Sequence, residues 1–171
     1  MSVVLVEGVT DRIALEAVAA RLGRDLGRDG VEIVPIGGAQ AIRRASAQHD
    51  GKRVAGLCDV GEERWFRRVL ADATYVCVKD LEDELIRALG VVRVQEVIAA
   101  QGELDTFRNF QNQVFWRKRP VELQLRRWLQ NGGRQRRYPP HLIEAMEPQE
   151  IPRPLVGVLA HVCLGSRGAR R

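Results

Sequence analysis

The chain has 171 residues, of which 45% are hydrophobic, and it carries a formal net charge of +5 with a sequence pI near 9.6. This apolar fraction is enough for a packed core, which excludes a disordered chain, and no apolar run approaches the roughly 20 residues that span a bilayer. The chain begins without a secretory signal pattern, and its three scattered cysteines lack disulfide or zinc spacing. We therefore expect a soluble, cytoplasmic protein with no membrane partner, whose basic balance favours a polyanionic ligand.

Short β-branched runs alternate with helical patterns along the first half of the chain. The runs cover residues 2–8, 31–38, 52–59 and 73–80, and the helical patterns between them lie near 9–22, 39–47 and 62–73. This alternation predicts parallel strands joined by right-handed crossovers, and the near-continuous apolar strands predict a sheet covered on both faces. We expect an α/β, Rossmann-like fold with about four mainly parallel strands sandwiched by helices.

The second half has a different character. Helices are predicted over residues 81–90 and 91–102, and another over 121–129 within a polar, basic and aromatic stretch. The proline-rich segment after residue 139 is expected to be broken into short pieces, and the tail, residues 166–171, to be frayed. We predict an α/β domain over residues 1–90, with a helical, basic region over 91–171 packed on it.

Acidic residues follow three of the predicted strands. The carboxyl ends of parallel strands lie at one edge of a sheet, so residues distant in sequence meet there. Crowded carboxylates repel each other unless a cation neutralises them, and their hard oxygens suit Mg²⁺ or Mn²⁺. Two such ions ~4 Å apart could clamp the attacking and leaving oxygens of a phosphoryl displacement. The acids after the first, third and fourth strands are Glu7 and Asp11; Asp59, Glu62 and Glu63; and Asp80, Glu82 and Asp83.

Taken singly, most of these acids are better explained by helix chemistry. Asp11 could cap the first helix, Glu62 could complement a helix dipole, and Asp80 with Asp83 has the spacing of a capping box. Glu7 is harder to explain in this way, because it extends a buried apolar run and an unpaired buried carboxylate is costly.

The acidic motifs resemble those of the TOPRIM superfamily. LVEGVTD, residues 5–11, is similar to its glutamate motif, and GLCDVGEE, residues 56–63, falls where the family carries its aspartate motif. KDLEDEL, residues 79–85, is similar to the further acidic motif of the OLD-type (overcoming lysogenization defect) nucleases. The resemblance covers about residues 1–90 and implies a Rossmann-like TOPRIM fold that holds Mg²⁺ or Mn²⁺ for phosphodiester chemistry.

The resemblance also implies roles for individual residues, and two positions depart from the family pattern. The aspartate motif commonly reads Asp-x-Asp, but residue 61 is glycine, so Glu62 or Glu63 would have to substitute. OLD-type nucleases carry a downstream lysine that would stabilise the transition state, where NGGRQRRY, residues 131–138, offers arginines. The implied catalytic set is Glu7, Asp11, Asp59, Arg134 and Arg136, and the implied metal ligands are Glu7, Asp11, Asp59, Asp80, Glu82, Glu62 and Asp83.

Full-length OLD-type proteins carry an ATPase domain ahead of the TOPRIM domain. Here Met1 precedes the first predicted strand almost directly, and the sequence has no Gly-Lys-Ser/Thr phosphate loop. We therefore expect a stand-alone TOPRIM protein that does not hydrolyse ATP, with a separately encoded ATPase as a candidate partner.

Positive charge and aromatic residues concentrate between residues 107 and 138. Arginine and lysine neutralise backbone phosphates, and we interpret these cations as nucleic-acid ligands because a solvated face would normally mix signs. Exposed aromatics could stack on unpaired bases, but for the aromatics we prefer a core role. The predicted nucleic-acid ligands are Arg117, Lys118, Arg119, Arg126, Arg127 and Arg137.

These observations favour a nuclease dependent on Mg²⁺ or Mn²⁺ that cleaves nucleic-acid phosphodiester bonds, with DNA favoured as substrate. One alternative is a catalytically impaired TOPRIM module that binds nucleic acid or an ATPase. Another is a phosphotransferase or hydrolase of small nucleotides that uses the same acidic residues. A homo-oligomer is left open.

Overall fold

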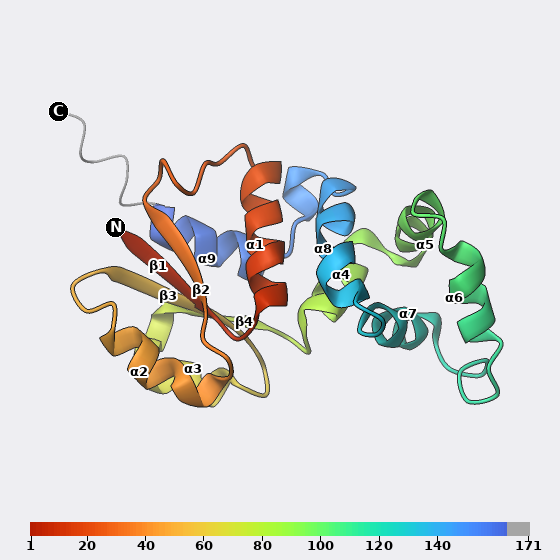
Figure 1. Cartoon of the computed structure of the whole chain (residues 1–171), viewed down its shortest axis with the longest axis horizontal. Helices are drawn as coiled ribbons and strands as arrows, with labels where there is room; N and C mark the ends of the chain where they lie inside the picture. Colours follow the sequence, from red (N-terminus) through yellow and green to blue (C-terminus); the bar gives the residue numbers. More distant parts are fainter. Residues whose placement is uncertain (164–171) are drawn as a thin grey trace.

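The computed structural model describes residues 1–163, and its centre is a four-stranded parallel sheet (Figure 1). Its strands pair in the order β2-β1-β3-β4, and Val6 lies in register with Pro35 and Leu57, which aligns the carboxyl ends of the central strands. The strands are β1 (Ser2–Val6), β2 (Val31–Pro35), β3 (Arg53–Asp59) and β4 (Thr74–Cys77). The predicted α/β class and the four parallel strands are confirmed.

Helices cover both faces of the sheet, as the sequence predicted. Alternate side chains of β1 point to opposite faces: Val4 and Val6 join the larger core cluster, while Val3 and Leu5 join the smaller one. One face is covered by α1 (Val9–Arg21) and α9 (Arg153–Cys163), and the other by α2 (Ile42–Ala47) and α3 (Glu63–Leu70) (Figure 1). Short 3₁₀ turns, η1 (Ala39–Ala41) and η2 (Ala71–Ala73), flank α2 and α3.

Two glycines allow helices to approach the sheet closely. A Cβ on Gly56 of β3 would lie 2.6 Å from the Phe66 ring of α3. On the opposite face, a Cβ on Gly157 of α9 would lie 2.6 Å from the Tyr75 ring of β4. Any side chain at either position would push the helix and the sheet apart.

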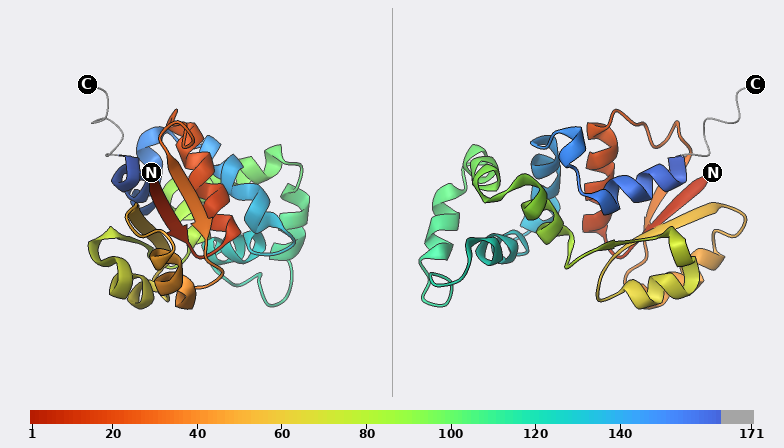
Figure 2. Two further views of the ribbon diagram at one scale, coloured as in Figure 1. Left: turned by 60° about the vertical axis from the view of Figure 1, so that its left-hand side comes forward. Right: turned by 180° about the vertical axis from the view of Figure 1, so that it is seen from behind.

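The remaining helices extend the molecule away from the sheet. Figure 2 shows this extension in its right-hand view, where α5, α6 and α7 lie far from the strands while α8 stays beside α1. Phe107, Trp128 and Tyr138 belong to the same core cluster as β1, so the extension and the sheet share one apolar core. The elements are α4 (Leu81–Leu89), α5 (Val91–Ala100), α6 (Leu104–Gln111), α7 (Val121–Leu129), α8 (Arg134–Glu144) and η3 (Pro148–Glu150).

The predictions for the second half were partly wrong. The helix predicted over residues 121–129 is present with those bounds, but α6 and α8 were not predicted, and α8 contains Pro139 and Pro140. The closing segment is not broken throughout, because residues 153–163 form one continuous helix. Pro152 and Pro154 lie at the start of this helix, where a missing N–H loses no intrahelical hydrogen bond.

The predicted boundary at residue 90 stays a prediction, although α9 from the second region covers the sheet. The tail predicted to fray lies outside the described residues. No helix within residues 1–163 combines the length and the apolar character that crossing a membrane requires.

Candidate active site

A cavity of about 430 Å³ lies at the carboxyl ends of the strands. Its walls combine the ends of β1, β3 and β4 with the first turn of α4, and residues of α8 and the end of α7 close it. Five of the predicted metal ligands line this cavity: Glu7, Asp11, Asp59, Asp80 and Glu82. Residues separated by up to 75 positions in sequence are therefore brought to one place by the parallel sheet.

Glu7 and Asp59 come directly from the sheet. Glu7 follows β1, and Asp59 is the last residue of β3, the neighbouring strand. Burial raises the pKa of the Glu7 carboxyl, and the negative charges of Asp59, Glu62 and Asp11 raise it further. The two strand ends thus place the Asp59 carboxylate close enough to oppose the ionisation of Glu7.

Asp11 has both a structural and a cavity-facing position. Its Oδ2 accepts a hydrogen bond from the backbone N–H of Gly8 at 2.9 Å, closing the N-terminus of α1. Burial raises the pKa of Asp11, partly offset by its backbone hydrogen bonds, and the charge of Asp59 raises it further. The capping interpretation therefore holds for this residue, and the same carboxylate lines the cavity.

Asp80 is the N-cap of α4 and is held by three donors. Its Oδ1 accepts from the Asp83 backbone N–H at 2.9 Å, while Oδ2 accepts from Arg126 Nε at 2.7 Å and Gln130 Nε2 at 2.9 Å. Arg126 also forms an ion pair with this carboxylate. Arg126 of α7 and Gln130, which follows this helix, thereby fix the orientation of Asp80 at the cavity wall.

Glu82 is the most buried of the cavity acids, with 7% of its surface exposed. Burial raises the pKa of its carboxyl, and the charges of Asp80 and Asp11 add to this effect, while hydrogen bonding from Gln130 opposes it. A carboxylate this buried, beside other acids, is costly unless something neutralises it.

Three predicted or alternative ligands lie outside the cavity lining. Asp83 is paired with Lys79 at 3.1 Å and Arg87 at 2.8 Å. Glu63 is paired with Arg67 at 2.5 Å. Glu62 does not line the cavity either, but its charge acts on Glu7, which makes it the better substitute for the acid missing at residue 61.

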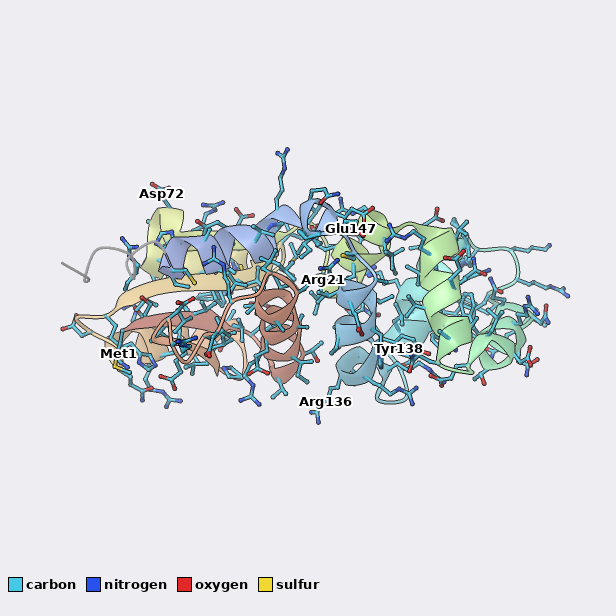
Figure 3. All side chains as sticks on the ribbon, turned by 90° about the horizontal axis from the view of Figure 1, so that it is seen from above. Met1, Arg21, Asp72, Arg136, Tyr138 and Glu147 are labelled. Carbon is cyan, nitrogen blue, oxygen red and sulfur yellow. The ribbon has the colours of Figure 1, made fainter. Side chains whose placement is uncertain are left out.

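The predicted catalytic arginines do not reach the cavity wall. Arg134 Nη2 contacts Glu103 Oε1 at 3.2 Å, and its guanidinium carbon lies 3.9 Å from the centroid of the Trp128 ring. Arg136 is exposed on the first turn of α8, and Figure 3 places it at the edge of the molecule. Among the described residues that line the cavity, none is an arginine or a lysine.

Two glutamines and one arginine at the site were not predicted. Gln130 and Gln135 line the cavity, and Arg126 was assigned to nucleic acid although it binds Asp80. No local pattern marks these residues, because their positions follow from the packing of α7 and α8 against the sheet domain.

The predicted nucleic-acid ligands differ in how free they are. Five of them are exposed: Arg117, Lys118, Arg119, Arg127 and Arg137. Arg137 is bound to Glu103, which also accepts from the Tyr138 hydroxyl at 2.7 Å. Arg117, Lys118, Arg119 and Arg127 have no carboxylate partner within residues 1–163 and remain available to phosphates.

The donor set of the cavity fits a hard divalent cation. Over residues 1–163 no three acidic, cysteine or histidine side chains converge tightly enough to be recognised as a preformed metal site. The five cavity carboxylates nevertheless supply only oxygen ligands, and those of Glu7, Asp11 and Glu82 have raised pKa values because of burial and mutual repulsion. Mg²⁺ or Mn²⁺ would relieve both penalties.

Comparison with known proteins finds a family model that matches the first part of the chain. Residues 1–59 match the family described as the overcoming lysogenization defect protein-like TOPRIM domain. This segment of the chain is similar to an OLD-like TOPRIM domain. The resemblance drawn from the acidic motifs is therefore confirmed, and the matched segment includes Glu7, Asp11 and Asp59.

Solved structures agree on the fold across nearly the whole chain. The C-terminal region of the Xanthomonas campestris pv. campestris OLD protein is 22% identical, with a TM-score of 0.73 over 97% of this chain and 93% of that one. The C-terminal region of the Burkholderia pseudomallei OLD protein is 14% identical, with a TM-score of 0.71 over 96% and 98%. No curated protein matches the chain. The OLD-like architecture thus includes the helical extension as well as the sheet.

Proposed function

We propose that this OLD-like TOPRIM chain is a nuclease dependent on Mg²⁺ or Mn²⁺ that cleaves nucleic-acid phosphodiester bonds, with DNA favoured as substrate. The observation that carries the proposal is the convergence of five carboxylates from three strand ends in one cavity. TOPRIM domains generally bind divalent metals, and the raised pKa values of Glu7, Asp11 and Glu82 are those of a site that needs positive charge.

In this proposal Glu7, Asp11 and Asp59 hold one cation, and Asp80 and Glu82 help to hold a second. When bound, such cations neutralise the phosphodiester and stabilise the charge that develops during an in-line displacement. Arg126 and Gln130 act on Asp80 by fixing its carboxylate, as outer ligands of a metal site do. Asp11 ties the first turn of α1 to the same wall through Gly8.

Side chains at the end of α7 and on α8 would contact the phosphate of a bound substrate. The side-chain amides of Gln130 and Gln135 line the cavity and can donate hydrogen bonds to phosphate oxygens. Arg136 is the next residue on the same helical turn and is exposed, so it is free to reach a bound backbone. We assign the transition-state cation to Arg136, because Arg134 is bound to Glu103 and Trp128.

The test is metal-dependent nicking of supercoiled plasmid. Glu7→Gln should lower Mn²⁺-dependent nicking by at least ~100-fold, since changes to outer partners of metal ligands alone lower activity by about 10–100-fold. Glu16→Gln makes the same chemical change on the exposed side of α1 and should leave nicking unchanged. Equal nicking by wild type and Glu7→Gln would identify the activity as a contaminant and refute the proposal.

Two observations favour a second candidate, a TOPRIM module that binds nucleic acid or a separately encoded ATPase without cutting. The aspartate motif lacks its second acid, and Asp80 is already neutralised by Arg126. This candidate predicts that wild-type protein binds DNA but does not nick plasmid with Mg²⁺ or Mn²⁺. Nicking that depends on Glu7 would exclude it.

A further inference from the structure

A second hollow of about 390 Å³ lies on the outer side of α7. We call it the aromatic groove, and its lining includes Phe115, Trp116, Arg119, Arg126, Arg127 and Gln130. The loop between α6 and α7 supplies the rings, and α7 supplies most of the polar side chains. It is thus a mixed aromatic and basic surface outside the acidic cavity.

Among residues 1–163, the groove contains the group of aromatics that the core clusters do not include. Phe107, Trp128 and Tyr138 are buried, as the preferred interpretation of the sequence held, but Phe115 is 64% exposed. Its ring lies 5.1 Å from that of Trp116, edge to face, and the guanidinium carbon of Arg119 lies 4.9 Å from its centroid. An exposed phenylalanine held beside a tryptophan and an arginine offers a stacking surface.

The aromatic groove and the acidic cavity share a wall. Gln130 lines both. Arg126 lines the groove and binds Asp80, which lines the cavity, through Nε at 2.7 Å. Figure 1 shows α7 running between the outer loop and α4, so one helix forms the wall that connects the two sites.

The charge of this surface matches a nucleic-acid backbone. Between residues 115 and 130 the chain carries Arg117, Lys118, Arg119, Arg126 and Arg127 against the single acid Glu122. A double helix hides its base faces inside the stack, whereas an unpaired strand presents them to aromatic side chains. Rings and cations together therefore fit an unpaired strand better than a paired one.

We propose that the aromatic groove binds unpaired nucleotides that flank the phosphate held in the acidic cavity. The substrate class is then single-stranded nucleic acid, or duplex with a frayed or single-stranded segment. A base stacks on the Phe115 ring, the neighbouring cations hold its phosphates, and Gln130 marks the passage into the cavity. This inference rests on the proposed function for its cavity end, but the binding surface can be tested separately.

The test measures binding in EDTA, where no cleavage occurs, using fluorescence anisotropy with labelled oligothymidylate, oligouridylate and a blunt duplex. Phe115→Ala should weaken binding of the single strands about tenfold, within the range for loss of one stacked base. Phe115→Tyr keeps the ring and should bind as wild type. The blunt duplex should bind both variants equally, because phosphate contacts are unchanged.

Each outcome decides the inference. Unchanged single-strand affinity in Phe115→Ala, or an equal loss for blunt duplex, would overturn it and leave a protein partner as the occupant of the groove. Ring-dependent binding of oligothymidylate or oligouridylate supports it, and the stronger of the two indicates whether a DNA or an RNA strand is preferred. Ring-dependent binding without metal-dependent nicking would support this inference and refute the nuclease proposal. Metal-dependent nicking without ring-dependent binding would support the nuclease proposal and refute this inference.

Discussion

Glu82 shows, at the level of a single residue, why this cavity should need a cation. Burial and the charges of Asp80 and Asp11 raise its pKa in the folded protein, so the folded state holds its proton to higher pH than the unfolded chain. Its contribution to stability is therefore present below the unfolded pKa and is lost as pH rises through the folded pKa. Above the unfolded pKa and without metal, the Glu82 carboxyl is therefore a net cost to the folded state.

We predict that Glu82→Gln raises the melting temperature at pH 7.5 in EDTA, because glutamine keeps the size of the side chain and cannot ionise. Each kcal/mol gained corresponds to about 2–4 °C for a chain of this size. The difference should shrink near pH 4, and Mn²⁺ should stabilise wild type more than the variant. Thermal denaturation followed by circular dichroism measures all three, and a lower melting temperature for Glu82→Gln in EDTA would contradict the prediction.

Glu103 makes the stability of the fold depend on pH in the opposite direction. Burial would raise the pKa of its carboxyl, but hydrogen bonds from Tyr138 and Arg137, with the charge of Arg134, outweigh burial and hold the pKa below its usual range. A carboxylate with a depressed pKa stabilises the fold above its unfolded pKa, and this stabilisation is lost as pH falls through the folded value.

Glu103→Gln should therefore lower the free energy of unfolding by about 2 kcal/mol at pH 7, the range for hydrogen bonds to a charged group. The melting temperature would fall by about 4–8 °C. The gap between wild type and variant should shrink as pH is lowered toward 3, because protonation of Glu103 removes the charge that the variant lacks. Tyr138→Phe, which removes one donor, should lie between them at pH 7; an equal gap at both pH values would show that charge plays no part.

The sequence located the acids of the cavity better than the groups that orient them. Glu7 and Asp59 could be placed because parallel strands end at one edge, a rule that needs only the strand pattern. Gln130 reaches the cavity from a helix near the other end of the chain, and Arg126 meets Asp80 across 46 residues. Such contacts depend on how α7 packs, which no local periodicity encodes.

At the level of elements, local sequence patterns predicted the first half of the chain better than the second half, which depends more on tertiary packing. Apolar runs bounded by glycine and aspartate predicted the strands, and the amphipathic stripe of residues 121–129 predicted α7. Pro139 and Pro140 argued against α8, yet that helix forms because its buried side chains, including Tyr138 and Leu142, pack into the shared core. Tertiary burial here outweighs the local penalty of proline.

Replacing Gly157 of α9 by alanine is a test in which helix propensity predicts a gain in stability and packing predicts a loss. Alanine favours a helix over glycine by about 1 kcal/mol, but its Cβ would lie 2.6 Å from the Tyr75 ring. That ring is held by a hydrogen bond between its hydroxyl and His161 Nδ1 at 3.2 Å, so it cannot move freely.

We predict that Gly157→Ala destabilises the protein by a net ~1–2 kcal/mol, because overpacking exceeds the gain in propensity. Chemical denaturation measures the change, and the Tyr75→Leu background provides the control, since a smaller neighbour should turn Gly157→Ala neutral or stabilising. A stabilising effect of the single variant would mean that α9 lies farther from β4 than the structure shows.

At the scale of the whole molecule, the positive charge is unevenly placed around an elongated body. The acids gather at the cavity, while the unpaired cations of residues 117–127 lie on the helical extension that Figure 2 shows away from the sheet. A small nucleotide would occupy the cavity and touch few of these cations, whereas a strand of nucleic acid would cover both regions. Salt dependence separates the two, because each neutralised phosphate releases counterions.

The last prediction compares two variants with the same net charge. One replaces three cations of the extension by glutamine, and the other replaces three at or near the opposite edge of the sheet, so that each falls from +5 to +2. The two sets are Arg117, Lys118 and Arg119, and Arg24, Arg28 and Lys52. For single-stranded DNA, the first set should reduce the slope of log affinity against log salt by about 2, at ~0.7 per lost phosphate contact, and the second should leave it unchanged. Equal slopes for both variants would indicate a long-range effect of net charge, and a shallow slope in wild type would point to a small nucleotide as the natural ligand.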